Sequence, residues 1–254
     1  MPGTIHSLRK AADILNLFTQ DFKLCGISDM ARMLDIPKAT VQNLVRTLEE
    51  IGYLEKDIDS SKYKLGPVLF QLGMKYATTM DLAVIARTWL ERLCQQFNES
   101  AHAGMLVGGR VIIVLRVEPE NRFMVFPQTG SVIPFHTSSI GKIILAFMDP
   151  KKRESALSNY SFMKLTERSI VNLADFMNEL DNVREDGIGF DLQESVTGLS
   201  CVGGPILNHR GDCIAAFSIS GNSFNIEKNR EEIVSAVRYV SSQMSSQLGY
   251  RKNI

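Results

Sequence analysis

DIPKATVQNLVRTLEEIGYLEKD, residues Asp35 to Asp57, predicts the fold of the N-terminal part of the chain. The residue before a proline avoids helical dihedrals, and proline suits the first position of a helix. We therefore expect a turn at Asp35–Ile36 and a helix from Pro37 to about Ile51. At 100° per residue its apolar side chains gather on one side, which must be the packed face. These side chains are Val41, Leu44, Val45, Leu48 and Ile51.

The opposite side of this helix carries small, amide and guanidinium side chains, whereas its acids, Glu49 and Glu50, are confined to the last turn. A solvated helix face usually carries Glu/Lys pairs, while Gln, Asn and Arg can make paired hydrogen bonds to base edges. We therefore predict that this side contacts DNA. The predicted residues are Lys38, Ala39, Thr40, Gln42, Asn43, Arg46 and Thr47.

The flanking segments complete a winged helix-turn-helix. Apolar spacing predicts a first helix from Ser7, and Ser28 is expected to cap a short second helix that ends near Leu34. After Gly52, alternating residues on both sides of DIDSS predict a two-stranded wing. The wing lysines Lys56, Lys62 and Lys64 are expected to contact phosphate. A small helical domain with a merely polar outer face is the alternative.

Composition limits the class of protein. At 254 residues, two domains are expected, and the 44% hydrophobic content is typical of globular chains. The 28 Lys/Arg balance 28 Asp/Glu, so bulk charge does not indicate nucleic acid. No apolar run approaches the roughly 20 residues of a membrane span, and the N-terminus lacks a secretory pattern, so we expect a cytoplasmic protein. The four cysteines lack C-x-x-C spacing, which favours free thiols.

The remaining residues predict an α+β domain with an antiparallel sheet. A linker helix spans residues 66–77, and a longer helix with an apolar stripe spans Asp81 to Phe97. Two apolar hairpins turn at Gly108-Gly109 and at NHRGD. The other expected elements are helices at 139–147, 173–185 and 227–248, and a strand at 188–192.

This domain shows no convincing catalytic pattern. No histidine has a partner at metal-ligand spacing, and SSIGK at residues 138–142 departs from a phosphate loop, so it is interpreted as a helix start. Ser218 and Ser220 share one strand face with Cys201 on the paired strand. Together with amides at the start of the helix at Ser139, this face would suit a small anion. Asp191 fits there only if its carboxylate accepts from a hydroxyl or an amide.

Two alternatives from other classes remain open. One is a thiol-dependent enzyme built on Cys201 and His209, although a lone cysteine on an apolar strand is usually inert packing. The other is a module that binds only other proteins, for which the sequence offers no positive feature. No metal, cofactor or catalytic residue is expected under the DNA-binding interpretation.

Over nearly its whole length the sequence resembles the IclR family, named after the isocitrate lyase regulator. The resemblance rests on these segments, in order: SLRKAADILNLF, IPKATVQNLVRTLEEIGYLEKD, YKLGPVLFQLG, IPFHTSSIGKIILA, LTERSI, VREDGIGFDLQESVTGLSCVGGPI and GDCIAAFSISG. It implies a winged helix-turn-helix at 1–66, a linker helix at 67–80 and a GAF-like effector domain at 81–254.

The resemblance also implies a function. The protein would be a bacterial transcriptional regulator, a repressor rather than an activator, which binds a near-palindromic operator as a dimer or dimer of dimers and responds to a small organic or sugar acid. Its effector-binding residues would be Val125, Ile133, Ser139, Ile140, Asp191, Leu199, Cys201, Ser218 and Ser220. Two departures matter: Asn43 replaces a common Arg, and Gly203-Gly204 replaces a frequent Ala-Ala, which could widen the pocket or loosen the strand.

Overall fold

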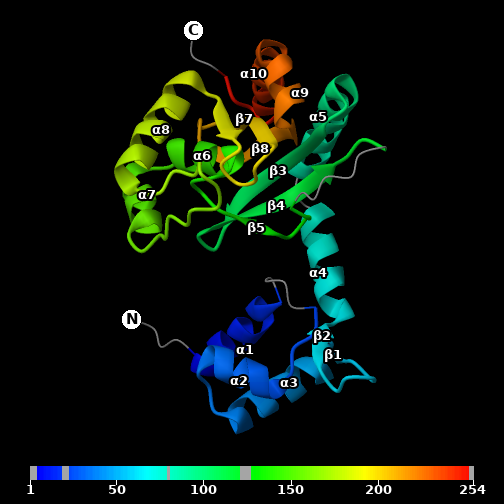
Figure 1. Ribbon diagram of the computed structural model, residues 1–254. Coiled ribbons are helices and arrows are strands. Elements are labelled where there is room, and N and C mark those ends of the chain that lie inside the picture. Colours follow the sequence, from blue (N-terminus) through cyan, green and yellow to red (C-terminus); the bar gives the residue numbers. More distant parts are fainter. Residues whose placement is uncertain (1–4, 19–22, 79–80, 121–126, 252–254) are drawn as a thin grey trace. The chain divides into compact units, whose positions relative to one another are not determined.

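The computed structural model describes residues 5–18, 23–78, 81–120 and 127–251. The chain divides into two compact units, Met1–Met80 and Asp81–Ile254 (Figure 1). Among the described helices none is both long and apolar enough to cross a membrane.

The N-terminal unit is a winged helix-turn-helix, as predicted. It contains the helices α1 (His6–Leu17), α2 (Ile27–Leu34) and α3 (Lys38–Glu50), the wing strands β1 (Leu54–Lys56) and β2 (Tyr63–Leu65), and the linker helix α4 (Pro67–Thr78). Its core gathers one apolar face from each of α1, α2 and α3 against the wing. The wing strands are antiparallel, and Cys25 adds a backbone bridge to Tyr63.

Three local predictions in this unit are wrong. Gly26, in an extended conformation, is the N-cap of α2, so Ser28 lies inside the helix and does not cap it. Pro37 is the N-cap of α3 and not its first residue, because its ψ of 133° is extended. Ile51 is the C-cap of α3 and is 51% exposed, because the chain turns away from the core there.

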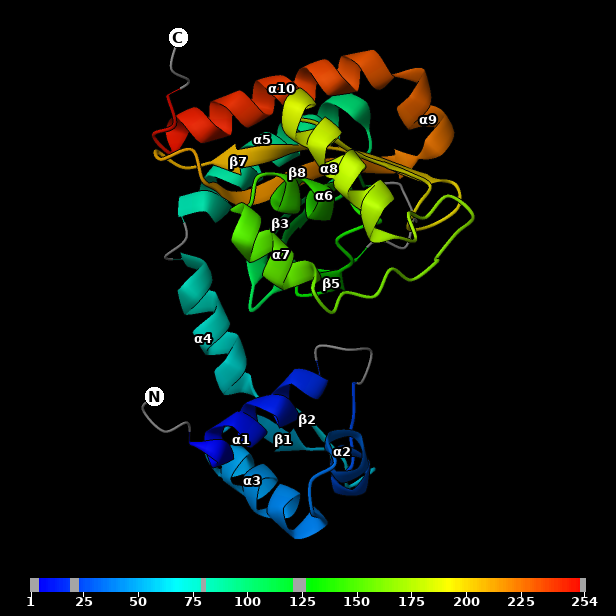
Figure 2. The same cartoon turned by 90° about the vertical axis from the view of Figure 1, so that its left-hand side faces the viewer.

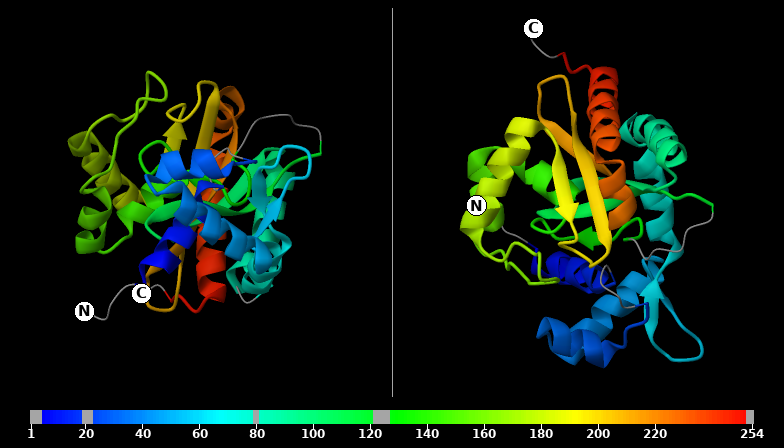
Figure 3. Two further views of the ribbon diagram at one scale, coloured as in Figure 1. Left: turned by 90° about the horizontal axis from the view of Figure 1, so that it is seen from below. Right: turned by 45° about the horizontal axis from the view of Figure 1, so that its top comes forward.

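The C-terminal unit contains a six-stranded sheet in the order β5-β4-β3-β8-β7-β6. Its strands are β3 (Ser100–Val107), β4 (Arg110–Val117), β5 (Val132–Ile133), β6 (Gly189–Leu192), β7 (Leu199–Leu207) and β8 (Cys213–Asn222). All pairs are antiparallel, and both predicted hairpins, β3–β4 and β7–β8, are present (Figure 3). Gly108 and Gly109 both have positive φ, which the tight β3–β4 turn requires. The α+β prediction is confirmed.

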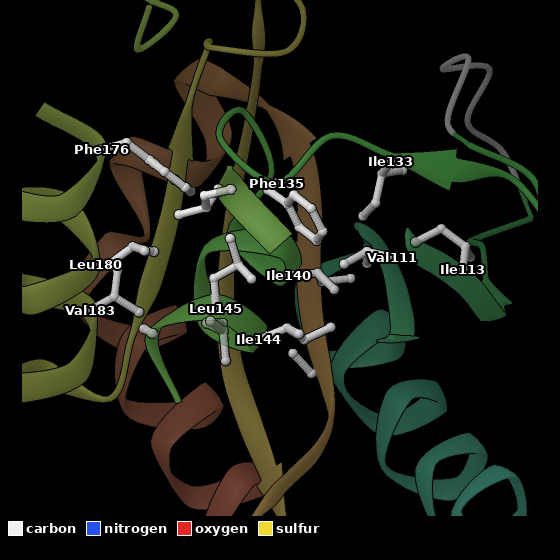
Figure 4. Packing of buried hydrophobic residues seen from close by; sticks show 14 residues of the cluster. Val111, Ile113, Ile133, Phe135, Ile140, Ile144, Leu145, Phe176, Leu180 and Val183 are labelled. Atoms are coloured by element: carbon white, nitrogen blue, oxygen red, sulfur yellow. The ribbon is translucent and has the colours of Figure 1, made fainter. Parts of the chain in front are cut away.

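Helices cover both faces of this sheet (Figure 1). One face packs against α5 (Asp81–Phe97) and α10 (Arg230–Gln247), and the other against α6 (Ser139–Ala146), which lies between the sheet and α8 (Leu173–Asp186). Every residue of α6 is buried. Figure 4 shows Leu180 and Val183 of α8 on one side of α6, with Ile140 directed toward Val111 of the sheet.

Three features of this unit differ from the sequence prediction. The terminal helix expected at residues 227–248 is α10, which begins at Arg230 because the chain breaks at Asn229; the short helix α9 (Ser223–Lys228), which precedes it, was not predicted (Figure 2). The helix α7 (Pro150–Leu157) was not predicted, since its charged sequence carries no apolar stripe. The two-residue strand β5 is too short for an alternating pattern to show.

Candidate DNA-binding face and effector cavity

The polar side of α3 faces solvent, as its periodicity predicts. Val41, Val45 and Leu48 are buried against the core of the N-terminal unit. The residues predicted to contact DNA are exposed, apart from Thr40, which is half-buried; the others on this helix are Lys38, Ala39, Gln42, Asn43, Arg46 and Thr47. The sequence therefore folds into a helix that presents amide, hydroxyl and cationic groups on one accessible side.

Arg46 is ion-paired within α3. Its Nε lies 3.1 Å from Oε1 of Glu50, and the two side chains are 79% and 61% exposed. Exposed i,i+4 pairs contribute only a few tenths of a kcal/mol, so the pair breaks easily when a better partner is offered. The sequence suggested that Glu50, in the last turn, lies outside the DNA-facing region. The structure shows that it pairs with the Arg46 guanidinium, which belongs to that region.

The wing brings its three predicted lysines onto one hairpin, but one of them, Lys64, is neutralised by a neighbouring carboxylate. Glu55 pairs with Lys64 across the strands, and their side chains form an ion pair of 3.4 Å. Lys56 and Lys62 are exposed. At the turn, Asp57 accepts hydrogen bonds from the hydroxyl and the amide of Ser60, and these bonds lower the pKa of its carboxyl. Lys56 and Lys62 are thus the better candidates for phosphate contacts.

A cavity of about 120 Å³ lies in the C-terminal unit between the sheet and the first turn of α6. All the described residues predicted to bind an effector line it: Ile133, Ser139, Ile140, Asp191, Leu199, Cys201, Ser218 and Ser220. Val125 lies outside the described residues. The cavity also has lining residues that the sequence prediction missed: His102, Ile113, Pro127, Pro134, Ser138, Ser195 and Val196.

Strand register aligns polar side chains along the sheet side of the cavity. Ser220 of β8 pairs with Cys201 of β7, and Cys201 pairs with Asp191 of β6. Two residues along β8, Ser218 pairs with His102 of β3. The hydroxyls of Ser218 and Ser220 lie 3.3 Å apart. Residues from four strands therefore form one continuous polar patch along this side of the cavity.

The first turn of α6 forms the opposite side. Ser138 is its N-cap, and the Ser138 hydroxyl accepts from the Gly141 amide at 3.1 Å and donates to the Pro134 carbonyl at 2.5 Å. First-turn amides have no partner within a helix and carry the positive end of its dipole. Because Ser139 and Ile140 line the cavity, this end of α6 favours a negatively charged group there.

Asp191 meets the condition set for it by the sequence. Its carboxylate accepts from the amides of Glu194 and Ser195, at 2.7 and 3.3 Å, and from the Ser195 hydroxyl. Burial raises the pKa of its carboxyl, and these hydrogen bonds oppose that rise. The carboxylate thus organises the loop after β6.

His102 is an uncharged member of the cavity at neutral pH. It is 3% exposed, and burial, followed by the charge of Arg116, lowers its pKa to about 4. Sequence reasoning missed it because β3 and β8 are far apart in the chain, so only their pairing places His102 beside Ser218. The one local signal was that His102 and Ser100, two residues apart on β3, place polar side chains on the same face of that strand.

Comparisons with known proteins agree with this architecture. The family described as "Bacterial transcriptional regulator IclR C-terminal" matches residues 74–246, and "IclR helix-turn-helix domain" matches residues 7–57. The chain belongs to the IclR family. It is thus related to helix-turn-helix transcriptional regulators and not to enzymes.

Individual IclR relatives match at full length. The glycerol operon regulatory protein of Streptomyces coelicolor is 31% identical over 98% of this chain and 98% of its own. An IclR transcriptional regulator from Alicyclobacillus acidocaldarius has a TM-score of 0.85 at 24% identity, covering 97% and 100% of the two chains. An IclR homologue from Microbacterium hydrocarbonoxydans, crystallised with 4-hydroxybenzoate, has a TM-score of 0.81 at 23% identity, covering 95% and 98%.

The thiol-enzyme alternative is wrong for this IclR protein. Cys201 lies near the start of β7, whereas the exposed His209 lies beyond its other end, roughly 20 Å away at the usual rise per strand residue. Burial and the neighbouring Asp191 raise the pKa of the Cys201 thiol well above its ordinary value. Among the described residues no group of His, Cys, Asp or Glu could hold a metal ion.

The interpretation of residues 138–142 as a helix start is confirmed, and the Lys142 side chain is buried against Glu179 and Glu194. The suggestion that Gly203-Gly204 widens the pocket is wrong, because neither glycine lines the cavity. A Cβ on Gly203 would lie 2.5 Å from the Phe217 carbonyl and 3.0 Å from Ile143, so Gly203 allows α6 to pack closely on the sheet. Gly204 faces Val237 of α10 on the other side.

Proposed function

We propose that this IclR-family protein is a repressor that binds operator DNA as a dimer and changes its operator affinity when a small organic acid enters the cavity. The observation that carries the proposal is the cavity of about 120 Å³, in which hydroxyls and the first turn of α6 converge between apolar walls. Family membership supports the regulatory role, and the exposed polar side of α3 supports DNA contact.

The lining favours a carboxylic acid with a small apolar body. Ser139, Ser218 and the first-turn amides of α6 supply hydrogen-bond donors for a carboxylate, and Ile113 and Leu199 supply apolar surface. Space of this order accommodates about one six-membered ring. A sugar acid would bury several hydroxyls, each of which requires a partner, so aromatic and short aliphatic acids fit better. The relative crystallised with 4-hydroxybenzoate agrees with this class.

On DNA, the two α3 helices of a dimer would enter successive major grooves of a near-palindromic operator. Arg46, Gln42 and Asn43 would contact base edges, and Lys56 and Lys62 would contact phosphates. Repression requires only that the bound protein exclude polymerase, so no further surface is needed. Such a protein acts in the cytoplasm, where the bacterial chromosome lies, and two dimers can associate on longer operators.

The first test measures thermal unfolding of the full chain with 4-hydroxybenzoate, benzoate and short dicarboxylates. A ligand at 100 times its dissociation constant adds about 2.7 kcal/mol to the native state. We expect the resulting shift to be lost in Ser218→Val, whose hydroxyl lines the cavity, and retained in Ser242→Ala, whose hydroxyl is exposed on α10. A shift that survives Ser218→Val would place the ligand elsewhere.

The second test measures anisotropy of a labelled duplex from the DNA upstream of the protein's own gene, with and without the stabilising acid. The proposal requires that the acid change the affinity for this duplex and leave the affinity for random DNA unaltered. Equal operator affinity with and without the acid would contradict regulation of DNA binding.

A further inference from the structure

One wall of the cavity is a loop whose conformation is stabilised by residues outside the loop. The loop Gln193–Gly198 follows β6, and its residues Ser195 and Val196 line the cavity. Gln193 has a φ of 66°, a left-handed conformation that non-glycine residues rarely adopt. Its side-chain oxygen accepts from the Gly198 amide at 2.9 Å and closes the loop on itself. Such a backbone persists only where surrounding contacts stabilise it.

Lys142 of α6 adds an ion pair to the hydrogen bonds that Asp191 makes with the loop. Its Nζ lies 2.7 Å from Oε1 of Glu194, in the loop, and 2.9 Å from Oε1 of Glu179, on α8. The Lys142 side chain is 1% exposed and that of Glu194 is 9% exposed. A buried ammonium and a buried carboxylate each need an opposite charge, so separating this pair is costly.

Neutral hydrogen bonds attach the same residue to a second segment. The Glu194 carbonyl accepts from the hydroxyls of Thr166 and Ser169, at 3.2 and 2.8 Å. The other carboxylate oxygen of Glu194, Oε2, is buried and has no hydrogen-bond partner among the described residues. Besides Lys142, Oε1 accepts from the Leu192 amide at a long 3.4 Å, so Lys142 is the main partner that places this carboxylate.

We propose that Lys142 is a positioning residue for the effector cavity: its ion pair with Glu194 holds the loop Gln193–Gly198 as a closed wall, and separation of this pair opens the cavity to a ligand. Glu179 shares the same ammonium but lies on α8, so it neutralises Lys142 without holding the wall. The inference rests on the proposed function only in assigning the cavity to an effector; the wall can be tested without ligand or DNA.

The test uses Cys201, which is buried behind this wall and lines the cavity. The full chain is treated with methyl methanethiosulfonate: the Cys201 thiolate attacks the methylthio sulfur, a disulfide forms, and methanesulfinate leaves. Modification is followed for each cysteine-containing peptide by mass spectrometry. Glu194→Gln and Glu179→Gln each replace one carboxylate by an isosteric amide next to the same lysine, so they form a matched pair.

We expect Glu194→Gln to raise the modification rate of Cys201 about tenfold or more, because a hydrogen bond to a charged group is lost from the closed state. Glu179→Gln should change that rate less than about twofold. Cys94, buried on α5, is the internal reference and should react equally in all three proteins. The Glu194 charge itself raises the pKa of the Cys201 thiol, so the rate is also measured in Glu194→Asp, which keeps the charge but shortens the reach. The same acceleration is expected there, and this variant also serves if Glu194→Gln does not fold.

Two results would overturn the proposal. Equal Cys201 rates in the wild type and both variants would mean that the pair does not hold the wall. Parallel acceleration of Cys201 and Cys94 would mean that the substitution loosens the whole unit. Neither result bears on effector or DNA binding, so failure here leaves the proposed function standing, and failure of the ligand screen leaves the wall mechanism standing.

Discussion

The two units carry ion pairs of opposite character. Arg46 and Glu50 pair at 3.1 Å on the outer side of α3, with 79% and 61% of their side chains exposed. Lys142 and Glu194 pair at 2.7 Å with 1% and 9% exposed. Water competes for the first pair and is excluded from the second. An exposed pair can therefore be exchanged for a base or phosphate, whereas a buried pair fixes the conformation around it.

The largest expected effect removes the buried cation. Lys142→Ala leaves Glu194 and Glu179 without their ammonium, so the free energy of unfolding of the C-terminal unit should fall by about 3 to 5 kcal/mol. Trp89, the single tryptophan, lies on α5, so its fluorescence in urea reports on this unit. Lys152→Ala, at an exposed position on α7, is the control and should change little.

The same variant has an expected pH dependence. Burial raises the pKa of the Glu194 carboxyl, and Lys142 opposes that rise, so the pKa should be higher still in Lys142→Ala. A carboxyl with a folded pKa above its unfolded value binds its proton first in the native state, so the variant should regain stability as pH falls. A deficit that is constant with pH would show that lost packing, and not unpaired charge, causes it.

A buried and an exposed histidine extend the comparison. The pKa of His102 is about 4 in the folded protein and about 6.5 when unfolded, so the unfolded chain binds this proton first as pH falls. The stability it contributes is fully present above pH 6.5 and is lost as pH falls toward 4. Between pH 7.5 and 4 the wild type should lose about 3 kcal/mol more than His102→Gln.

His209 is the control for this measurement, because it is exposed in the hairpin turn after β7. Wild type and His209→Gln should lose stability in parallel over the same pH range. If His102→Gln also paralleled the wild type, the pKa of His102 would be the same in the folded and the unfolded protein, and burial would not be what keeps the ring uncharged.

On DNA, Arg46→Ala should weaken operator binding by about 1 to 3 kcal/mol and leave binding to random duplex nearly unchanged. Arg32→Ala provides the matched control: Arg32 is also exposed and also ion-paired within its helix, to Asp29 at 2.9 Å, but it lies on α2. Equal weakening on both duplexes would identify Arg46 as a phosphate contact. A loss in Arg32→Ala as large as that in Arg46→Ala would contradict the assignment of operator recognition to α3.

The outer side of α3 and the surroundings of the cavity also differed in how far the sequence could predict them. The outer side of α3 follows from a local period, so its residues were placed on the accessible side, with Thr40 half-buried at the border. The hairpin pattern likewise placed Cys201 on the strand that pairs with the strand of Ser218 and Ser220. His102 joins Ser218 through strands far apart in the chain, and Lys142 meets Glu179 and Glu194 across 37 and 52 residues. No local pattern encodes such meetings.

The smallest expected effect tests the exposed pair itself. Glu50→Gln releases Arg46 and removes a negative charge close to where phosphates would lie. Since an exposed i,i+4 pair is worth about 0.3 to 0.5 kcal/mol, operator affinity should rise by about twofold. Glu49→Gln removes an equal charge one residue away and controls for the general electrostatic gain, which should shrink as salt rises.

Coupling to Arg46 is separated from charge by a double-mutant cycle. In the Arg46→Ala background, Glu50→Gln should give no more than the gain of Glu49→Gln, because no guanidinium is left to release. If Glu50→Gln gained equally in both backgrounds, the pair would not restrain Arg46, and Glu50 would act only by repelling phosphate. The Arg46–Glu50 ion pair would then have no measurable effect on DNA binding, in contrast to the structural role of the Lys142–Glu194 pair.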